Sequence, residues 1–335
     1  MNSNLVSILM PVKNAAPFLK ACLESILAQT YTNWELIAVN DHSSDDTVAI
    51  LADFTKRDNR IKVLAPEGKG IIPALQTAYK KSRGEFITRM DADDLMTEDK
   101  LAVMTQQLLQ SGRGYLATGC VRYFSARELG QGYENYAHWL NELTRKGDNF
   151  SEIYKECVIP SPCWMIYRED FELCGAFNST RYPEDYDLAF RFYKEGLKVI
   201  PSNQVLHHWR DYEVRTSRTD ANYADNSFIP LKCHYFSLLD YDPNRQLVLW
   251  GAGRKGKQLA AELVKQHIPF RWVCNNSRKI GQYIHGVQLE RLNSDLLNSM
   301  NQLIIAIASP ADQEEILSLL ENYNLTKGKD YFFFC

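Results

Sequence analysis

Short apolar runs alternate with amphipathic segments from Leu5 to Met90, and this alternation constrains the fold of the chain more than any other feature. The apolar runs have the length of strands, whereas the segments between them repeat apolar residues at helical spacing. Strands that alternate with helices form a mainly parallel sheet with right-handed crossovers, so we predict an α/β fold. The runs cover residues 5–10, 34–39, 61–64 and 86–90, and the helical segments begin near Pro17, Asp45 or Asp46, and Ile72.

The second helical segment is expected to place one face on the sheet. Asp45 or Asp46 is predicted to cap its N-terminus. The residues predicted to be buried are Val48, Ile50, Leu51 and Phe54.

Polar groups follow three of the predicted strands. Ligands of parallel α/β sheets bind beyond the carboxyl ends of the strands, so we expect the three groups to converge on one site. They are residues 11–14 (Pro-Val-Lys-Asn), 40–44 (Asn-Asp-His-Ser-Ser) and 91–94 (Asp-Ala-Asp-Asp).

The last of these groups carries three carboxylates, those of Asp91, Asp93 and Asp94. Hard divalent cations that bind together with phosphate substrates take one or two carboxylates, and such a cation would relieve the repulsion within the cluster. A site for a cation and a polyphosphate is therefore one interpretation, and a solvated acidic turn is the other.

With these three groups in this order, the chain resembles the family 2 glycosyltransferases, over roughly its first two-thirds. Two later segments complete the pattern, residues 183–188 (Pro-Glu-Asp-Tyr-Asp-Leu) and the Trp-Arg-Asp of 209–211 with the basic run 215–219. The resemblance implies an A-type (GT-A-like) nucleotide-diphospho-sugar transferase fold. It also implies transfer of a sugar, with inversion, from a nucleotide-diphosphate donor to an acceptor hydroxyl, with Mn²⁺ or Mg²⁺ as cofactor.

The resemblance assigns roles to the residues at the strand ends. Asp93 and Asp91 are the implied metal ligands, with Asp94 as a further candidate. Asp41 is suited to accept the imide N–H of a uracil-like base, which favours a UDP-sugar donor. The implied nucleotide-sugar contacts are Pro11, Val12, Asn14, Asp41, Arg89 and Asp91, and Lys13, Lys69 and Arg89 are available to the diphosphate.

Asp185 is the implied catalytic base, paired with Glu184. An acceptor hydroxyl is a poor nucleophile, so a carboxylate must take its proton during attack. The like charges of Glu184 and Asp187 are expected to raise the pKa of Asp185. The alternative is a helix start, since Pro183 suits the first turn and acidic residues favour the helix dipole. Both roles are compatible.

The third metal ligand is open in this sequence. In some relatives a histidine follows the aromatic–arginine pair, and here Tyr212 stands at that place. His207 or His208 is a candidate substitute, although paired histidines at a strand end are more often structural. Arg210, Arg215 and Arg218 are candidates to bind diphosphate or an anionic acceptor, or are surface charges.

The pattern restarts after a linker at residues 240–244, so we expect a catalytic domain at 1–240 and a small Rossmann-like α/β domain at 245–335. Its glycine turn has the spacing of a dinucleotide site at Gly251, Gly253 and Gly256. The acidic residue that should follow the next strand is replaced by residues 274–276 (Cys-Asn-Asn), which disfavours nicotinamide binding. Tight packing, an acceptor site and a regulatory nucleotide site remain as roles for the glycines.

Composition excludes several classes. A net charge of −3 argues against a nucleic-acid binder. Eight scattered cysteines without a Cys-x-x-Cys pair fit reduced thiols in a cytoplasmic protein. We see no signal peptide and no membrane-spanning run.

The expected partners are a nucleotide-sugar donor and a saccharide or lipid-linked acceptor, in polysaccharide or lipopolysaccharide synthesis at the cell surface. Peripheral contact with the inner membrane face is compatible with this role, and the oligomeric state is left open. A nucleotidyltransferase and a non-catalytic nucleotide-sugar sensor are the alternative functions. Only a glycosyltransferase gives Asp185 a task.

Overall fold

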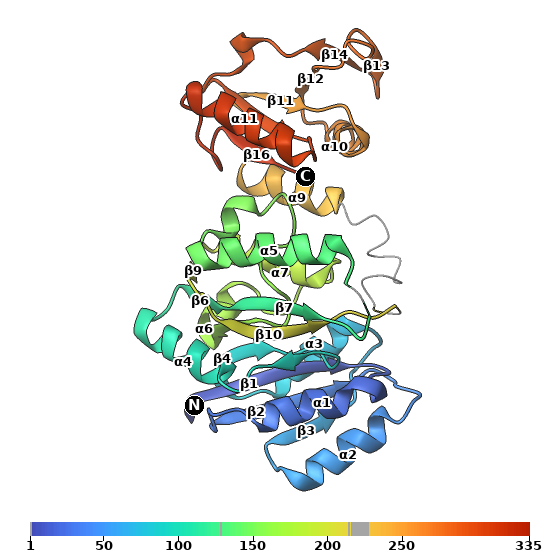
Figure 1. Cartoon of the computed structure of the whole chain (residues 1–335), viewed down its shortest axis with the longest axis vertical. Coiled ribbons are helices and arrows are strands. Elements are labelled where there is room, and N and C mark those ends of the chain that lie inside the picture. Colours follow the sequence, from blue (N-terminus) through green and yellow to red (C-terminus); the bar gives the residue numbers. More distant parts are fainter. Residues whose placement is uncertain (1, 128, 214, 216–227) are drawn as a thin grey trace. The chain divides into compact units, whose positions relative to one another are not determined.

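The computed structural model describes residues 2–127, 129–213, 215 and 228–335 (Figure 1). Contacts divide the chain into two units. Unit 1 comprises Met1–Asn149 and Val158–Ala224, and unit 2 comprises Phe150–Cys157 and Asp225–Cys335, each within the described ranges. Unit 2 thus includes Phe150–Cys157 and the chain just before residue 240, which the sequence had assigned to the first domain.

Unit 1 is built on a seven-stranded sheet with the order β3-β2-β1-β4-β8-β6-β9. Strands β1 to β4 are mutually parallel, and β8 pairs antiparallel with both β4 and β6. The strands are β1 (Asn2–Val12), β2 (Trp34–Asn40), β3 (Ile61–Leu64), β4 (Gly84–Arg89), β6 (Tyr115–Thr118), β8 (Trp164–Tyr167) and β9 (Lys198–Ile200). The predicted α/β fold with a mainly parallel sheet is confirmed.

The order of the strands decides which face each helix covers. The chain moves outward from β1 to β3 and then returns across β1 to β4. Right-handed crossovers therefore place α1 and α2 on one face and α3 on the other, as Figure 1 shows. The helices are α1 (Ala16–Leu27), α2 (Thr47–Arg57) and α3 (Ile71–Lys81).

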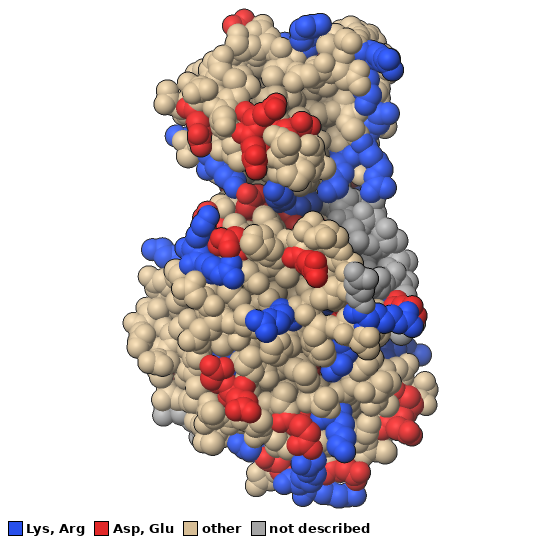
Figure 2. Space-filling view, viewed as in Figure 1, with Lys and Arg blue, Asp and Glu red and all other residues tan. Residues whose placement is uncertain are grey.

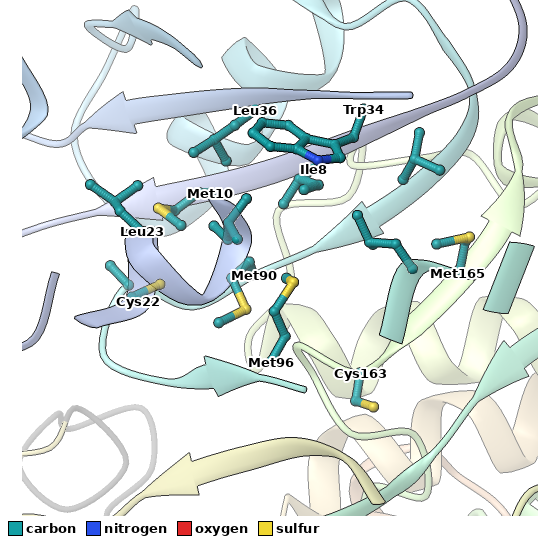
Figure 3. Close-up of a cluster of buried hydrophobic side chains, with 14 of the residues drawn as sticks. Ile8, Met10, Cys22, Leu23, Trp34, Leu36, Met90, Met96, Cys163 and Met165 are labelled. Carbon is teal, nitrogen blue, oxygen red and sulfur yellow. The ribbon is translucent and has the colours of Figure 1, made fainter. Parts of the chain in front are cut away.

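The main core of unit 1 lies between the sheet and the helices on the α1 side. Alternate residues of β1, including Ile8 and Met10, meet Cys22 and Leu23 of α1 (Figure 3). The prediction for α2 was partly wrong. Leu51 and Phe54 are buried, but Val48 is 51% exposed, and Thr47 is buried instead of Val48.

The rest of unit 1 adds a second sheet of three strands in the order β5-β10-β7. In this sheet β10 lies between β5 and β7. Strand β5 immediately follows residues 91–94 (Asp-Ala-Asp-Asp), which we call the acidic tetrad. The added strands are β5 (Leu95–Met96), β7 (Cys120–Phe124) and β10 (Val205–Arg210), and the added helices are α4 (Lys100–Ser111), α5 (Gln131–Lys146), α6 (Arg168–Leu173) and α7 (Glu184–Lys194).

Unit 2 has a six-stranded sheet in the order β13-β14-β12-β11-β15-β16, parallel except for the β13–β14 hairpin, which the sequence did not reveal. The sheet consists of β11 (Gln246–Trp250), β12 (Phe270–Cys274), β13 (Tyr283–Ile284), β14 (Val287–Arg291), β15 (Asn301–Ile305) and β16 (Tyr331–Phe333). Its helices in the described residues are α9 (Ile229–Leu239), α10 (Arg254–Lys265) and α11 (Pro310–Asn322). The short 3₁₀ turns in the described part of the chain are η1 (Asn149–Glu152) and η3 (Ser294–Leu296).

Two of the three glycines in the turn after β11 are needed for packing. A Cβ on Gly251 would lie 2.7 Å from the backbone O of Ala306, and one on Gly256 would lie 2.2 Å from the backbone O of Gly251. Gly251 also has a φ of 127°, which L side chains rarely adopt. The packing role suggested by the sequence therefore accounts for these two positions.

Segment 150–157 belongs to unit 2 through an aromatic cluster. The ring of Tyr154 stacks on Phe334 at 5.0 Å and meets Phe236 and Phe332 edge-on at 5.6 Å. Its hydroxyl donates to the Asp240 carboxylate. The chain thus leaves unit 1 after Asn149, completes the core of unit 2, and returns at Val158.

We expect Tyr154→Phe to lower the free energy of unfolding by about 1–2 kcal/mol, because the buried ring remains while a hydrogen bond to a carboxylate is lost. Urea titration measures the effect. Tyr323→Phe, at a ring that is 39% exposed, is the control. Equal stability of the two variants would contradict the prediction.

Acidic and basic side chains are interspersed on the face of unit 1 drawn in Figure 2, rather than gathered by sign. Among the described residues, no helix is long and apolar enough to cross a membrane.

Candidate active site

The carboxyl ends of three neighbouring strands bring the predicted polar groups together. In the sheet, β1 lies between β2 and β4, with Val12 opposite Asn40 and Leu9 opposite Arg89. Because parallel strands end at a common edge, residues 11–14, 40–44 and 91–94 all follow strands at that edge.

The first two loops are tied to each other by hydrogen bonds. The backbone N–H of Asn14 donates to Ser43 Oγ over 2.9 Å, and Asn14 Oδ1 accepts from the N–H of Ser44 over 2.8 Å. Asn14 and His42 both have positive φ, 47° and 54°, which is uncommon for residues other than glycine and recurs at functional sites. Pro11 and Val12 thus end β1, and Asn14 fixes the turn that follows them beside the loop after β2.

Asp41 is buried at 3% exposure, and both of its carboxylate oxygens are engaged. Oδ2 accepts from the N–H of Gly70 over 3.0 Å and lies 3.6 Å from Lys13 Nζ, while Oδ1 lies 3.1 Å from His42 Nδ1. Burial acts to raise the pKa of Asp41, but these contacts outweigh it and lower the pKa. Asp41 is therefore an ionised acceptor.

Gly70 is a contributor that sequence reasoning missed. Its φ of 103° lies where L side chains are strained, and this conformation directs its N–H to Asp41. The Gly-Lys-Gly spacing of residues 68–70 was the available signal. Lys69, between the two glycines, is exposed.

The tetrad after β4 is held by the end of β10. Tyr212 Oη donates to Asp93 Oδ2 over 2.9 Å, and the backbone N–H of Arg210 donates to Asp94 Oδ1 over 2.8 Å. Burial, followed by the charges of Asp94 and Asp91, raises the pKa of Asp93 to about 6. Arg215 and the Tyr212 hydroxyl act to lower the pKa of Asp93, but they do not outweigh burial and the neighbouring carboxylates.

Asp94 and His207 form a buried network with Lys100. His207 Nε2 lies 3.0 Å from Asp94 Oδ2, and His207 Nδ1 lies 3.2 Å from Lys100 Nζ. Burial, and then Lys100, lower the pKa of His207 well below its usual value, so the ring is neutral, with Nε2 donating and Nδ1 accepting. Both ring nitrogens are engaged, so His207 is structural, and Asp94 faces His207 rather than an open position.

Arg89 joins the two halves of the site. Its Nε donates to Asp91 Oδ1 over 2.8 Å, and its Nη1 donates to Glu184 Oε1 over 3.0 Å. Its side chain is only 6% exposed. Burial opposes the charge, but Asp91, Glu184 and Asp185 together raise the pKa of Arg89. The guanidinium thus connects the end of β4 with the start of α7.

Glu184 and Asp185 open helix α7 directly after Pro183, so the predicted helix start is also present. Burial, with the charge of Asp185, raises the pKa of Glu184. Burial also raises the pKa of Asp185, against the opposing effect of Arg89 and with a smaller contribution from Asp91. Because Glu184, the neighbour of Asp185, shares the Arg89 guanidinium with Asp91, the start of α7 lies beside the end of β4.

The residues of the tetrad fit a divalent cation that binds together with a phosphate ligand. Among the described residues, no hydrogen bond reaches Asp93 Oδ1 or Asp91 Oδ2. No group of three or more His, Cys, Asp or Glu in the described chain is arranged to hold a metal by itself. The protein therefore offers two carboxylates, which suits an ion whose other ligands are water and phosphate.

The remaining basic candidates differ in their surroundings. Arg210 Nε donates to the backbone O of Asp93, and its guanidinium lies 4.8 Å from the Phe18 ring and 4.4 Å from the Phe124 ring. Arg215 is half-buried, and Asp94 is the largest of the charges that raise its pKa against desolvation. Arg218 lies outside the described residues.

The sequence of this chain matches the family described as Glycosyl transferase family 2 over residues 7–174. The chain therefore belongs to glycosyl transferase family 2, and it is a glycosyltransferase. GlyG of Streptococcus pneumoniae serotype 4, a glycosyltransferase, is 28% identical over 225 residues, which cover 65% of this chain and 74% of GlyG.

A second relative is WfgD of Escherichia coli, a UDP-Glc:alpha-D-GlcNAc-diphosphoundecaprenol beta-1,3-glucosyltransferase. It is 39% identical over 117 residues, which cover 35% of this chain and 46% of WfgD.

Solved structures support the GT-A-like fold. Residues 1–349 of S. aureus TarS in complex with UDP-GlcNAc align with a TM-score of 0.54 at 16% identity, over 78% of this chain and 72% of TarS 1–349. The mannosyltransferase PcManGT of Pyrobaculum calidifontis, in complex with GDP-Man and Mn²⁺, aligns with a TM-score of 0.53 at 19% identity, over 79% of this chain and 70% of PcManGT.

Proposed function

We propose that this chain transfers a sugar, with inversion, from a UDP-sugar to an acceptor hydroxyl during synthesis of a cell-surface polysaccharide. The proposal rests on Arg89, because its guanidinium binds the carboxylates of both Asp91 and Glu184. The acidic cluster proposed to act on the leaving diphosphate and the acidic pair proposed to supply the base therefore belong to one site.

At the donor end, Asp41 accepts the imide N–H of uracil, and the end of β1 at Pro11 and Val12, with Asn14, borders the base and ribose. Asp93 and Asp91 would hold Mn²⁺ or Mg²⁺, which as a Lewis acid would stabilise the charge that develops on the leaving diphosphate. Arg89 orients Asp91, to which its Nε donates. The complexes of TarS with UDP-GlcNAc and of PcManGT with GDP-Man and Mn²⁺ support a nucleotide-sugar donor and a divalent cation as ligands.

At the acceptor end, Asp185 removes the proton. The acceptor oxygen forms its bond to the anomeric carbon as the bond to the diphosphate oxygen breaks, and the hydroxyl proton passes to Asp185. Glu184 positions Asp185 from the neighbouring place on α7, held by Arg89. The acceptor of WfgD supports a saccharide or lipid-linked acceptor.

The donor assignment is tested by UDP binding. We expect Asp41→Ala to weaken UDP affinity by about 10- to 100-fold, because a hydrogen bond to a charged acceptor is lost. Isothermal titration calorimetry measures the affinities for UDP and GDP, with Asp58→Ala as the control variant. Unchanged UDP affinity, or equal affinity of the wild-type protein for UDP and GDP, would refute the assignment.

The pH dependence of transfer follows from Asp185. Only the ionised carboxylate accepts a proton, and burial raises the pKa of Asp185. Activity should therefore rise with pH along a limb whose midpoint lies above the ordinary aspartate value of about 3.9. The profile of kcat/KM against pH measures this limb, and circular dichroism checks that the protein stays folded. A midpoint at or below the ordinary value would contradict the role.

A further inference from the structure

The carboxylate of Asp93 is oriented by a phenol. Tyr212 Oη donates to Asp93 Oδ2 over 2.9 Å. The Tyr212 ring is itself held, since its centroid lies 4.6 Å from that of Phe18 and its backbone O accepts from the N–H of Arg215. Because the Tyr212 ring is fixed and its hydroxyl bonds to Asp93 Oδ2, the orientation of the Asp93 carboxylate is fixed, and with it the direction of Oδ1.

The atoms of Asp93 and Asp91 that could bind a cation are carboxylate oxygens. Asp93 Oδ1 and Asp91 Oδ2 receive no hydrogen bond from the described residues. The imidazole that contacts the tetrad, His207, has Nε2 on Asp94 and Nδ1 on Lys100, so neither nitrogen is available. Among the described residues, the atoms that Asp93 and Asp91 leave open to a cation are therefore carboxylate oxygens.

We propose that Tyr212 is the positioning residue for Asp93 in a cation site whose ligands from the described residues are oxygens. The inference rests on the proposed cation site and deepens it. Oxygen ligands suit Mg²⁺ and Mn²⁺, whereas an imidazole ligand would favour Co²⁺ and Ni²⁺. Groups that hydrogen-bond to a ligating carboxylate fix its orientation and so support affinity.

Direct Mn²⁺ binding tests the proposal without relying on turnover. The loss of the electron paramagnetic resonance signal of free Mn²⁺ gives its Kd, and competition with Mg²⁺ and Ni²⁺ gives the selectivity. We expect Tyr212→Phe to weaken Mn²⁺ binding about 10-fold, as for other partners of metal-ligating groups. Tyr79→Phe is the matched control, because Tyr79 Oη also donates to a carboxylate, that of Glu172, over 3.0 Å.

The melting temperature of each variant without metal shows whether it folds.

The possible failures are distinguishable. If the wild-type protein binds no Mn²⁺, with or without UDP, the proposed cation site is wrong and this inference fails with it. If the wild-type protein binds Mn²⁺ and Tyr212→Phe binds it equally well, only the inference is overturned.

Discussion

Replacing Asp185 by Asn should lower kcat by about 10²- to 10⁴-fold, the usual contribution of a general base. The amide has nearly the shape of the carboxylate but takes no proton from the acceptor hydroxyl. Asp185 Oδ1 accepts the N–H of Tyr186, and an amide oxygen can accept the same bond. Affinity for the UDP-sugar should stay within about twofold, because binding the donor does not require proton transfer.

Initial rates of transfer and calorimetric donor binding, measured on the same preparation of Asp185→Asn, test the role of Asp185 as the general base. Glu195→Gln makes the same carboxylate-to-amide change at the exposed C-terminal end of α7 and should leave both quantities unchanged. Transfer within tenfold of wild type, or loss of donor binding in parallel with transfer, would remove Asp185 from its role. A sensor of nucleotide sugars would show no transfer in either protein.

Replacing Arg89 by Met should lower the free energy of unfolding by about 3–5 kcal/mol at pH 8, since removing one partner of a buried ion pair leaves charge uncompensated. Asp91 and Glu184 both lose their hydrogen bonds to the guanidinium. Transfer should be lost as well, because the two carboxylates no longer share a fixed partner.

The deficit of Arg89→Met should be smaller at acid pH. Arg89 lowers the pKa of Glu184, so its removal moves that pKa further above the unfolded value. A folded-state pKa that is raised for an acid makes the folded form bind more protons, and stability then falls as pH rises above the unfolded pKa. Urea titrations at pH 5.5 and pH 8 measure the difference.

The control for Arg89 is Arg83→Met. Arg83 also contacts a buried carboxylate, that of Glu35, but its own side chain is 67% exposed and Lys62 remains as a partner. Exposed ion pairs contribute little, so we expect a change below about 1 kcal/mol. Equal destabilisation by the two substitutions would contradict the claim that Arg89 is special.

The convergence of the site followed from local patterns in the sequence. Strand ends are recognisable from apolar runs, and the order of strands in a parallel sheet forces Asp41 and Asp91 to one edge. The buried face of α2 was harder to predict from the sequence. Thr47 and Val48 are neighbours, so a rotation of the helix by less than half a turn decides which of the two side chains is buried.

Contacts between distant segments could not be predicted in this way. Tyr212 was noted in the sequence for standing where some relatives have a histidine, but its bond to Asp93 joins residues on separate elements. Lys100 is fully buried against His207, whereas a lysine at a helix start is normally exposed. The inclusion of Phe150–Cys157 in unit 2 depends on ring packing of Tyr154, which no periodicity reveals.

The crystal structure of the Asp185→Asn variant with an intact UDP-sugar and Mn²⁺ tests the central claim most directly, namely that the tetrad and the start of α7 serve one reaction. We predict Mn²⁺ on Asp91 and Asp93, and the anomeric carbon between the diphosphate and residue 185, with the latter on the opposite face of the sugar. A donor whose sugar points away from residue 185, or a cation bound away from Asp91 and Asp93, would contradict the account.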